Sequence, residues 1–198
     1  MFTGIIKEVG RVQRVKNMDG GKELSIACDM APKVQVDQSI SINGACHTVT
    51  DHDAETFAVQ SVEETLRKTN MGDLEEGAGV NLERSLSAEQ LLDGHLVQGH
   101  VDGTGTIESI KQEGTDWLFT IKYAASFDDL IVGRGSIAVD GISLTVANNQ
   151  AQTFTVAMIP YTFEHTNLCD RQPGDVVNLE FDILGKYVVQ YLKNREKG

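Results

Sequence analysis

The sequence predicts an all-β protein made of two tandem, homologous small barrels, followed by a C-terminal α-helix. Three observations lead to this fold class. The second half of the 198-residue chain repeats the first, each copy has the texture of short strands joined by tight turns, and an apolar stripe at helical spacing follows the second copy.

The internal repeat sets the domain organisation. Residues 39–83 align with residues 136–180 at a constant shift of 97 without a gap, and 18 of the 45 pairs are identical. The opening segments align at a shift of 95, with Gly4 matching Gly99, so the copies differ by two residues in a loop. We therefore expect one barrel over residues 1–94, a second over residues 95–183, and a helix over residues 184–198.

Each copy contains alternating segments around turn dipeptides. Residues 39–50 alternate about Asn43-Gly44, and residues 136–147 repeat this arrangement about Asp140-Gly141, which is typical of a β-hairpin. In the first copy, further strands are expected at Ile5–Val15, Leu24–Cys28, Phe57–Val62 and Val80–Arg84. Five or six short strands favour a closed barrel, because closure removes exposed edges.

Two helical segments are also expected. Ser87 and Gln90 fit a capping box and predict a short helix at the start of the linker between the copies. The tail Leu184–Asn194 has helical periodicity, carried by Leu184, Tyr187, Val188, Tyr191 and Leu192. This stripe could dock on its own barrel or form a contact between subunits, and the sequence leaves both open.

Composition excludes several classes of protein. The net charge of −12 is spread along the chain without a basic stripe, which disfavours binding to nucleic acid. No apolar run approaches the ~20 residues that span a bilayer. Cys28, Cys46 and Cys169 are odd in number and no signal peptide is recognised, so we expect a cytoplasmic protein without disulfides.

Seven segments resemble a known family. They are Met1–Ile6, Asn43–Thr50, Glu64–Arg67, Val80–Arg84, Gly94–Gly103, Asp140–Val146 and Gly185–Tyr187. The chain is similar over most of its length to the trimeric, two-barrel riboflavin synthase family. The resemblance implies two six-stranded Greek-key barrels and a homotrimer joined through the C-terminal helices. Each active site would lie between the N-terminal barrel of one subunit and the C-terminal barrel of a neighbour.

The same resemblance implies the reaction. It is the last step of riboflavin biosynthesis, in which two molecules of 6,7-dimethyl-8-ribityllumazine dismutate to riboflavin and 5-amino-6-(D-ribitylamino)uracil. This is a transferase reaction that moves a four-carbon unit between two copies of one substrate. No cofactor and no metal are implied, and His95 and His100 have a spacing that suits no standard zinc pattern. Lumazine synthase is a candidate partner.

Four residues are implied to be catalytic: Cys46, His100, Ser39 and Arg134. A nucleophile and a proton-transferring group suit a substrate with an electrophilic ring carbon and an acidic methyl group. On residue type alone, a free cysteine is more often a small buried hydrophobe, and the histidine could serve only a structural hydrogen bond. The repeat partners of Cys46 and His100 are Ser143 and Ile5, which suggests two pockets with different roles.

Ring binding is implied for short segments in each copy. In the first copy they are Gly4, Ile5 and Ile6, then Cys46, His47 and Thr48, then Gln60, Ser61, Val62, Glu63, Glu64 and Thr65. In the second they are Gly99, His100 and Val101, then Ser143, Leu144 and Thr145, then Ala157, Met158, Ile159, Pro160, Tyr161 and Thr162, with Arg134 in addition. Hydroxyls and backbone amides would bind the ring edge, and apolar side chains would cover its faces.

Three features depart from the family pattern. Arg134 replaces the usual lysine, which keeps the charge but excludes a role for a neutral amine. His47 replaces a leucine, and because neighbouring residues of a strand take opposite faces, we expect it to point out of the barrel. The linker at Leu91–Gly94 is shorter than usual.

Two rival functions are considered. Lumazine proteins share the two barrels but bind lumazine or flavin as a fluorescent chromophore without turnover. The retention of Cys46, His100 and Ser143 favours an enzyme over such an antenna. A flavin-linked oxidoreductase module would need a nucleotide-binding partner domain, and no glycine-rich phosphate motif occurs in the sequence.

Overall fold

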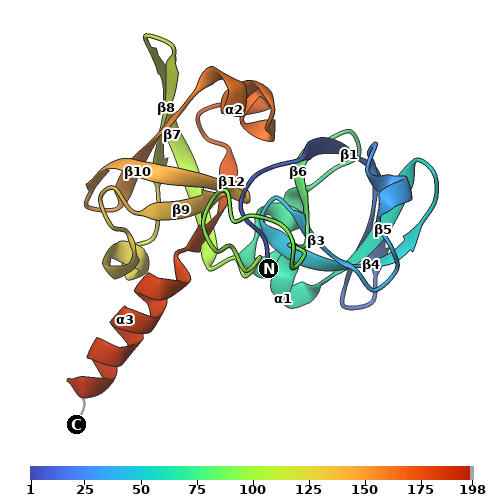
Figure 1. Ribbon diagram of the computed structural model, residues 1–198, viewed down its shortest axis with the longest axis horizontal. Helices are drawn as coiled ribbons and strands as arrows, with labels where there is room; N and C mark the ends of the chain where they lie inside the picture. Colours follow the sequence, from blue (N-terminus) through green and yellow to red (C-terminus); the bar gives the residue numbers. More distant parts are fainter. Residues whose placement is uncertain (197–198) are drawn as a thin grey trace.

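The computed structural model describes residues 1–196 and contains two closed antiparallel barrels beside one another, with a helix projecting from the second (Figure 1). In barrel 1 the strand order is β1-β2-β5-β4-β3-β6, and barrel 2 has the same order with six added to each number. The predicted fold class is confirmed.

The strands have the following bounds. Barrel 1 consists of β1 (Glu8–Met18), β2 (Gly21–Ala27), β3 (Ser39–Ile42), β4 (Ala45–His52), β5 (Thr56–Val62) and β6 (Gly79–Arg84). Barrel 2 consists of β7 (Gly103–Glu113), β8 (Asp116–Lys122), β9 (Ser136–Val139), β10 (Ile142–Gln150), β11 (Thr153–Met158) and β12 (Val176–Phe181).

Both predicted hairpins form at the dipeptides that the sequence indicated. Asn43 and Gly44 have φ of 47° and 81°, and Asp140 and Gly141 have φ of 44° and 80°, as a type I′ turn requires. The two turns lie back to back, since a Cβ on Gly44 would approach the backbone nitrogen of Gly141 to 2.7 Å. The hairpin tips therefore meet where the barrels join.

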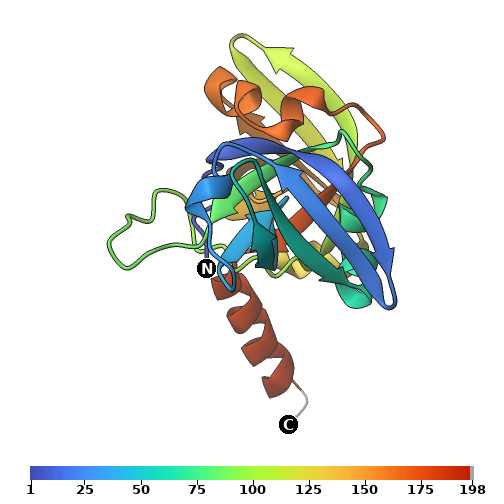
Figure 2. The same ribbon diagram turned by 90° about the vertical axis from the view of Figure 1, so that its right-hand side faces the viewer.

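The helices agree only partly with expectation. The C-terminal helix is confirmed as α3 (Ile183–Arg195), whose N-cap Asp182 accepts a hydrogen bond from the backbone of Leu184, and the last two positions of the expected helix, 197 and 198, lie outside the described residues. The linker helix predicted at Ser87 is wrong, because the segment forms a turn and the linker stands out as a loop (Figure 2). Not predicted were α1 (Glu63–Lys68), α2 (Pro160–Glu164) and the 3₁₀ turns η1 (Ala31–Lys33), η2 (Asn70–Asp73), η3 (Ala125–Leu130) and η4 (Asn167–Asp170).

Each barrel encloses its own apolar core. The two cores are built from repeat partners: Leu24, Ile26, Phe57, Val59 and Leu82 in barrel 1, and Phe119, Ile121, Phe154, Val156 and Leu179 in barrel 2. These side chains are at most 1% exposed, and the burial of apolar side chains is the dominant favourable contribution to folding. Within residues 1–196, no helix is long and apolar enough to cross a membrane.

The opening segment of each copy lies outside its barrel strands. The first strand was expected to begin at Ile5, but β1 begins at Glu8, and Ile5 and His100 both precede a strand. Instead the two opening segments pair with each other, since Phe2 and Val97 exchange backbone hydrogen bonds of 2.7 and 3.1 Å. The segments therefore cross at a pseudo-two-fold axis between the barrels.

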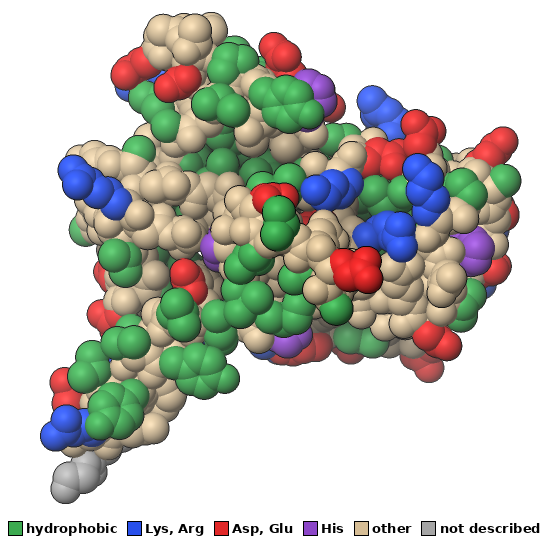
Figure 3. Space-filling model, in the orientation of Figure 1, with side chains coloured by type: hydrophobic (Ala, Val, Ile, Leu, Met, Phe, Trp, Pro, Cys, Tyr) green, Lys and Arg blue, Asp and Glu red, His purple; other side chains and the backbone are tan. Residues whose placement is uncertain are grey.

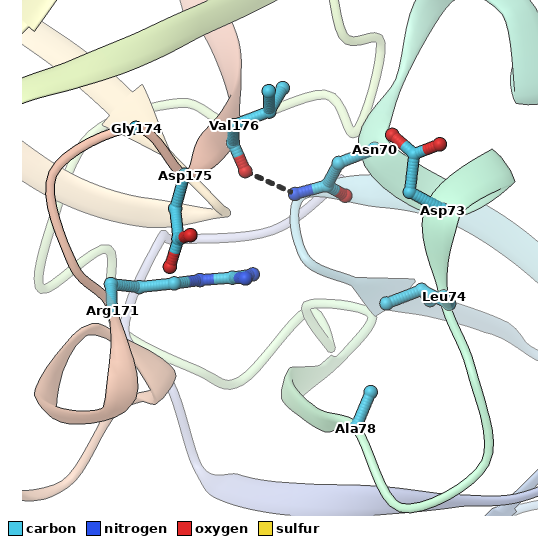
Figure 4. A pocket seen from close by; sticks show the side chains of 8 residues that line it. All are labelled: Asn70, Asp73, Leu74, Ala78, Arg171, Gly174, Asp175 and Val176. Carbon is cyan, nitrogen blue, oxygen red and sulfur yellow. Dashed lines mark hydrogen bonds between the residues drawn. The ribbon is translucent and has the colours of Figure 1, made fainter.

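A buried polar network also ties the barrels together. The carboxylate of Asp140 is fully buried and accepts hydrogen bonds from the side chains of Asn70, Asn167 and Arg171 and the backbone of Asn178. Figure 4 shows Asn70 and Arg171 reaching from opposite sides of a cleft of about 330 Å³. Because these donors come from both copies, the network fixes how the barrels sit against each other.

Candidate functional site

Two pockets occupy equivalent places on the two barrels. The barrel 1 pocket, of about 190 Å³, is lined by Ala45, Cys46, Glu64, Thr65, Lys68, Thr69, Gly99, His100 and Val101. The barrel 2 pocket, of about 80 Å³, is lined by Ile142, Ser143, Tyr161, Thr162, His165, Thr166, Gly4, Ile5 and Ile6. Every lining residue of one pocket is the repeat partner of a lining residue of the other.

Each pocket is completed by the opposite copy. Cys46 and the helix α1 belong to barrel 1, but the third wall of that pocket is the segment Gly99–Val101 that leads into barrel 2. In the same way, Gly4–Ile6 leads into barrel 1 yet lines the pocket of barrel 2. Each pocket therefore combines segments of both copies, because the opening segments cross before they enter their barrels.

Two glycines make the crossing possible. The backbone N–H of Cys46 donates to the carbonyl of Gly99 at 2.9 Å, and that of Ser143 donates to the carbonyl of Gly4 at 2.8 Å. The two glycines have φ of 81° and 76°, and a Cβ on either would lie 2.6 Å from the Cβ of its partner. Only glycine fits at these two positions.

The polar groups at the mouths of the two pockets differ. In the barrel 1 pocket, Glu64 pairs with Lys68 at 2.8 Å and with Arg67, and these hydrogen bonds lower the pKa of Glu64 to about 2. At the equivalent positions of barrel 2, the rings of Tyr161 and His165 stack with centroids 4.0 Å apart. One mouth is therefore charged and the other aromatic.

Cys46 and His100 meet in the barrel 1 pocket, although they come from different copies. Cys46 is half-buried on the outer face of β4, and His100 is exposed. Ser39 lies opposite Thr48 in the β3–β4 ladder, on the same outer face as Cys46. The structure thus brings a thiol, an imidazole and a hydroxyl to one side of barrel 1.

His47 lies inside barrel 1, so the prediction that it points outward is wrong. It is 5% exposed, its Nδ1 donates to the carbonyl of Ala45 at 2.9 Å, and its Nε2 accepts from the hydroxyl of Ser61 at 2.7 Å. Burial lowers the pKa of His47. Opposite faces for Cys46 and His47 are confirmed, but the pocket lies on the outer face, so Cys46 is the residue that points out.

Three other residues of the implied binding segments also point inward. The side chains of Ser61, Leu144 and Met158 are buried in the barrel interiors. The exposed residues of the same segments, which share the outer faces with Cys46 and Ser143, are Thr48, Gln60, Val62, Thr145, Ala157 and Ile159. Alternation thus leaves every second residue available to a ligand in the strand parts of these segments, whereas Glu63, Glu64 and Tyr161 in the helical parts are exposed as well.

Arg134 lies apart from both pockets of its own chain. It is exposed in the turn before β9, with φ of 66°, and its backbone N–H donates to the carbonyl of Val146 at 2.8 Å. It lines neither the barrel 1 pocket nor the barrel 2 pocket within residues 1–196.

Sequence reasoning missed the position of His95. Its Nδ1 lies 2.7 Å from the hydroxyl of Ser143, and burial lowers its pKa. His95 belongs to the linker and has no partner in the first copy, so comparison of the repeats could not find it. Lys68 and His165 were also missed. The signal that could have found them is their spacing of four residues from Glu64 and Tyr161 on short helices.

No cluster of side chains that could hold a metal ion occurs among residues 1–196.

Comparison with known proteins gives a consistent result. A model of the lumazine binding domain matches twice, at residues 3–85 and 98–182. A riboflavin synthase of Actinobacillus pleuropneumoniae is 39% identical over 193 residues, covering 97% of this chain and 90% of that protein. A riboflavin synthase of Bacillus subtilis (strain 168) is 38% identical with the same coverage.

A solved structure shares the fold. The crystal structure of LumP complexed with 6,7-dimethyl-8-(1'-D-ribityl) lumazine superposes with a TM-score of 0.82, covering 91% of this chain and 98% of that one. Its sequence identity is 22%. The likeness concerns the arrangement of the two barrels.

Proposed function

The chain belongs to the lumazine-binding domain family and acts as a riboflavin synthase, and we propose that its two pockets hold the two substrate molecules of that reaction. The enzyme is a transferase that converts two molecules of 6,7-dimethyl-8-ribityllumazine into riboflavin and 5-amino-6-(D-ribitylamino)uracil. One observation carries the proposal: the pockets consist of repeat partners throughout, yet differ in their reactive groups.

This arrangement suits a reaction between two copies of one compound. Equivalent walls recognise the same ring twice, whereas the reactive positions differ. Cys46 and His100 in the barrel 1 pocket correspond to Ser143 and Ile5 in the barrel 2 pocket. The substrate that gives up four carbons and the substrate that receives them need different activation. In our proposal the barrel 1 pocket supplies the thiol as nucleophile and the imidazole as proton carrier, whereas Ser39 lies on the same outer face as Cys46 without lining the pocket.

We further propose that the complete site forms between two chains of a homotrimer. The two pockets share no lining residue in residues 1–196, and in our proposal the two rings stack where the barrel 1 pocket of one chain faces the barrel 2 pocket of a neighbour. The helix α3 projects from barrel 2 with exposed apolar side chains along it (Figure 3): Leu184, Tyr187, Val188, Tyr191 and Leu192 are 52–70% exposed. A surface of this kind favours contact between subunits over docking on its own barrel.

Sedimentation tests the trimer. The full chain is expected to sediment as a trimer, and a chain without residues 184–198 as a monomer with both barrels folded. A trimer that survives the deletion would contradict the role of α3. We also propose that Arg134, which is exposed and lines neither pocket of its own chain, reaches the pocket of a neighbour in the trimer.

Two further proposals concern the surroundings of the protein. Cys28, Cys46 and Cys169 are free thiols, which fits the reducing cytoplasm. Lumazine synthase, whose product this enzyme consumes, is the proposed partner. Co-sedimentation of the two purified proteins tests the association, and separate boundaries would speak against it.

The decisive experiment is incubation with 6,7-dimethyl-8-ribityllumazine. Riboflavin is expected to appear as one molecule for every two lumazines consumed, followed by its absorbance and confirmed by chromatography. Stoichiometric binding without product would instead support an antenna protein, and would overturn the proposal.

A further inference from the structure

Two buried carboxylates lie behind the pockets and are not part of them. Glu83 on β6 and Glu180 on β12 are repeat partners and are 2% and 3% exposed. Burial raises the pKa of both carboxyl groups, and hydrogen bonds from backbone N–H groups act against that shift. Keeping a carboxylate at such a position is costly unless its oxygens have partners.

The partners of both carboxylates are the crossing segments. Glu180 accepts hydrogen bonds from the backbone N–H groups of Gln98 at 2.7 Å and Gly99 at 2.9 Å, one on each oxygen. Glu83 accepts from the backbone N–H groups of Thr3 at 2.7 Å and Gly4 at 2.9 Å, again one on each oxygen. Each carboxylate thus holds two successive N–H groups in a fixed orientation.

Each crossing segment is held from two sides. The N–H of Gly99 is bound by Glu180 of barrel 2, while its carbonyl accepts from the backbone of Cys46 in barrel 1. His100 is the next residue, so the position of its side chain in the barrel 1 pocket depends on both bonds. The equivalent bonds to Gly4, from Glu83 and Ser143, place Ile5 in the barrel 2 pocket.

We propose that Glu180 and Glu83 are crossed positioning residues, each of which lies in one barrel and shapes the substrate pocket of the other. Glu180 in barrel 2 fixes Gly99 and His100 against Cys46, and Glu83 in barrel 1 fixes Gly4 and Ile5 against Ser143. The inference rests on the proposed function for the role of the pockets, whereas the crossed geometry stands without it. Neither glutamate touches the substrate or the reacting atoms.

The two glutamates do not make the same number of hydrogen bonds to the crossing segments. Glu83 accepts an additional hydrogen bond of 2.7 Å from the hydroxyl of Thr3, whereas Gln98 at the equivalent position gives Glu180 no such bond. Loss of the carboxylate charge should therefore loosen the barrel 1 pocket more than the barrel 2 pocket. A glutamine is the right probe, because it keeps the shape but turns an N–H group toward one of the two backbone donors.

The test follows the alkylation of single cysteines by iodoacetamide, measured peptide by peptide with mass spectrometry on the full-length protein. In Glu180→Gln we expect Cys46 to react about tenfold faster, because the segment that covers it is released. Cys46 should react at the unchanged rate in Glu83→Gln, the matched control. With Ser143→Cys as reporter, the pattern should reverse, with Glu83→Gln faster and Glu180→Gln unchanged. Equal rates in all variants, or acceleration in the glutamate's own barrel, would overturn the proposal.

A second readout separates positioning from general destabilisation. Glu180→Gln should lower kcat for riboflavin formation about tenfold while the melting temperature stays within a few degrees of the parent. If Glu180→Gln does not fold, Glu180→Asp takes its place, since it keeps the charge but withdraws the oxygens by one methylene group. If Cys46 is alkylated faster in Glu180→Gln but riboflavin forms at the normal rate, Glu180 does not position His100 for the reaction. The alkylation experiments do not depend on turnover. If no riboflavin forms, the proposed function is refuted, but the alkylation rates still test the positioning by Glu180 and Glu83.

Discussion

Barrels 1 and 2 share one topology but differ in the barrel interior and in the reactive residues of the pockets. In the interior of barrel 1, His47 bonds to Ser61, and the equivalent positions of barrel 2 hold Leu144 and Met158. In the pockets, Cys46 and His100 correspond to Ser143 and Ile5. By contrast, the strand residues Val80–Glu83 are identical in Val177–Glu180. The copies have thus kept this strand and part of the pocket walls, such as Thr65 and Thr162, and have changed the reactive residues of the pockets and one interior pair.

The largest effect is expected where both pockets depend on a glycine. Gly99→Ala should reduce riboflavin formation by about 100-fold or more, because the new Cβ would meet Cys46 at 2.6 Å in a left-handed conformation. Gly4→Ala should do the same through the other pocket. Gly20→Ala is the control, since Gly20 has φ of 79° but open space around it, and steady-state kinetics should show it near the parent value. A normal rate in Gly99→Ala would show that the close crossing is not needed.

The second-largest effect is expected from the reactive side chains that differ between the two pockets. His100→Ala should lower kcat about 100-fold with little change in melting temperature, because the side chain is exposed. Cys46→Ala should lower turnover in the same way. The partner variants Ile5→Ala and Ser143→Ala show whether the asymmetry is real. If they cost as much as the barrel 1 variants, the two pockets do not have different chemistry.

The histidine in the interior of barrel 1, which barrel 2 lacks, predicts that the free energy of unfolding depends on pH. The pKa of His47 is lowered in the folded protein, so the folded state binds fewer protons than the unfolded state. The stability from this group is present above the ordinary histidine pKa of about 6.5 and is lost as the pH falls toward the lowered value, by about 1.4 kcal/mol for each pH unit. Urea unfolding at pH 7.5 and 5.5 measures it.

Replacing the pair with its barrel 2 counterpart should remove that dependence. In the double variant His47→Leu with Ser61→Met, the acid loss assigned to His47 should disappear. The single variant His47→Leu leaves the hydroxyl of Ser61 buried without a partner, which costs about 1–3 kcal/mol. His95, whose pKa burial also lowers, contributes a loss of the same sign in both proteins, so an acid loss as large in the double variant as in the parent would assign the effect to other groups.

The smallest effect is expected at the pocket mouths. Glu64 and Lys68 are exposed, and exposed ion pairs contribute about 0.2–1 kcal/mol. Replacing Tyr161 by Glu and His165 by Lys should therefore change the affinity for riboflavin only by about twofold to fivefold, and should make it sensitive to salt. Fluorescence titration at two ionic strengths measures both. A change of 100-fold would mean that the stacked rings are a main binding element.

Many residues of the site could be predicted from the sequence, but the way in which they come together could not. Cys46, His100, Ser143 and Thr162 were singled out, and all four line a pocket. His47 was placed on the wrong face because alternation states that neighbours differ but not which of them faces the core. The structure settles this, since Ala45 and His47 are buried inside the barrel and Cys46 lies half-buried on the outer face.

The sequence by itself determined the duplication, the hairpin turns, the small closed barrels that the short strands favour and the C-terminal helix, whereas the Greek-key topology was implied by the family resemblance. These features depend on local conformation and on periodic burial, both of which can be read along the chain. Only the tertiary structure decided that Gly4 and Gly99 cross to the opposite barrel. A repeat is compatible with either pairing, and the choice depends on contacts between residues about 80 or more positions apart, such as those of Glu83 and Glu180 with the crossing segments.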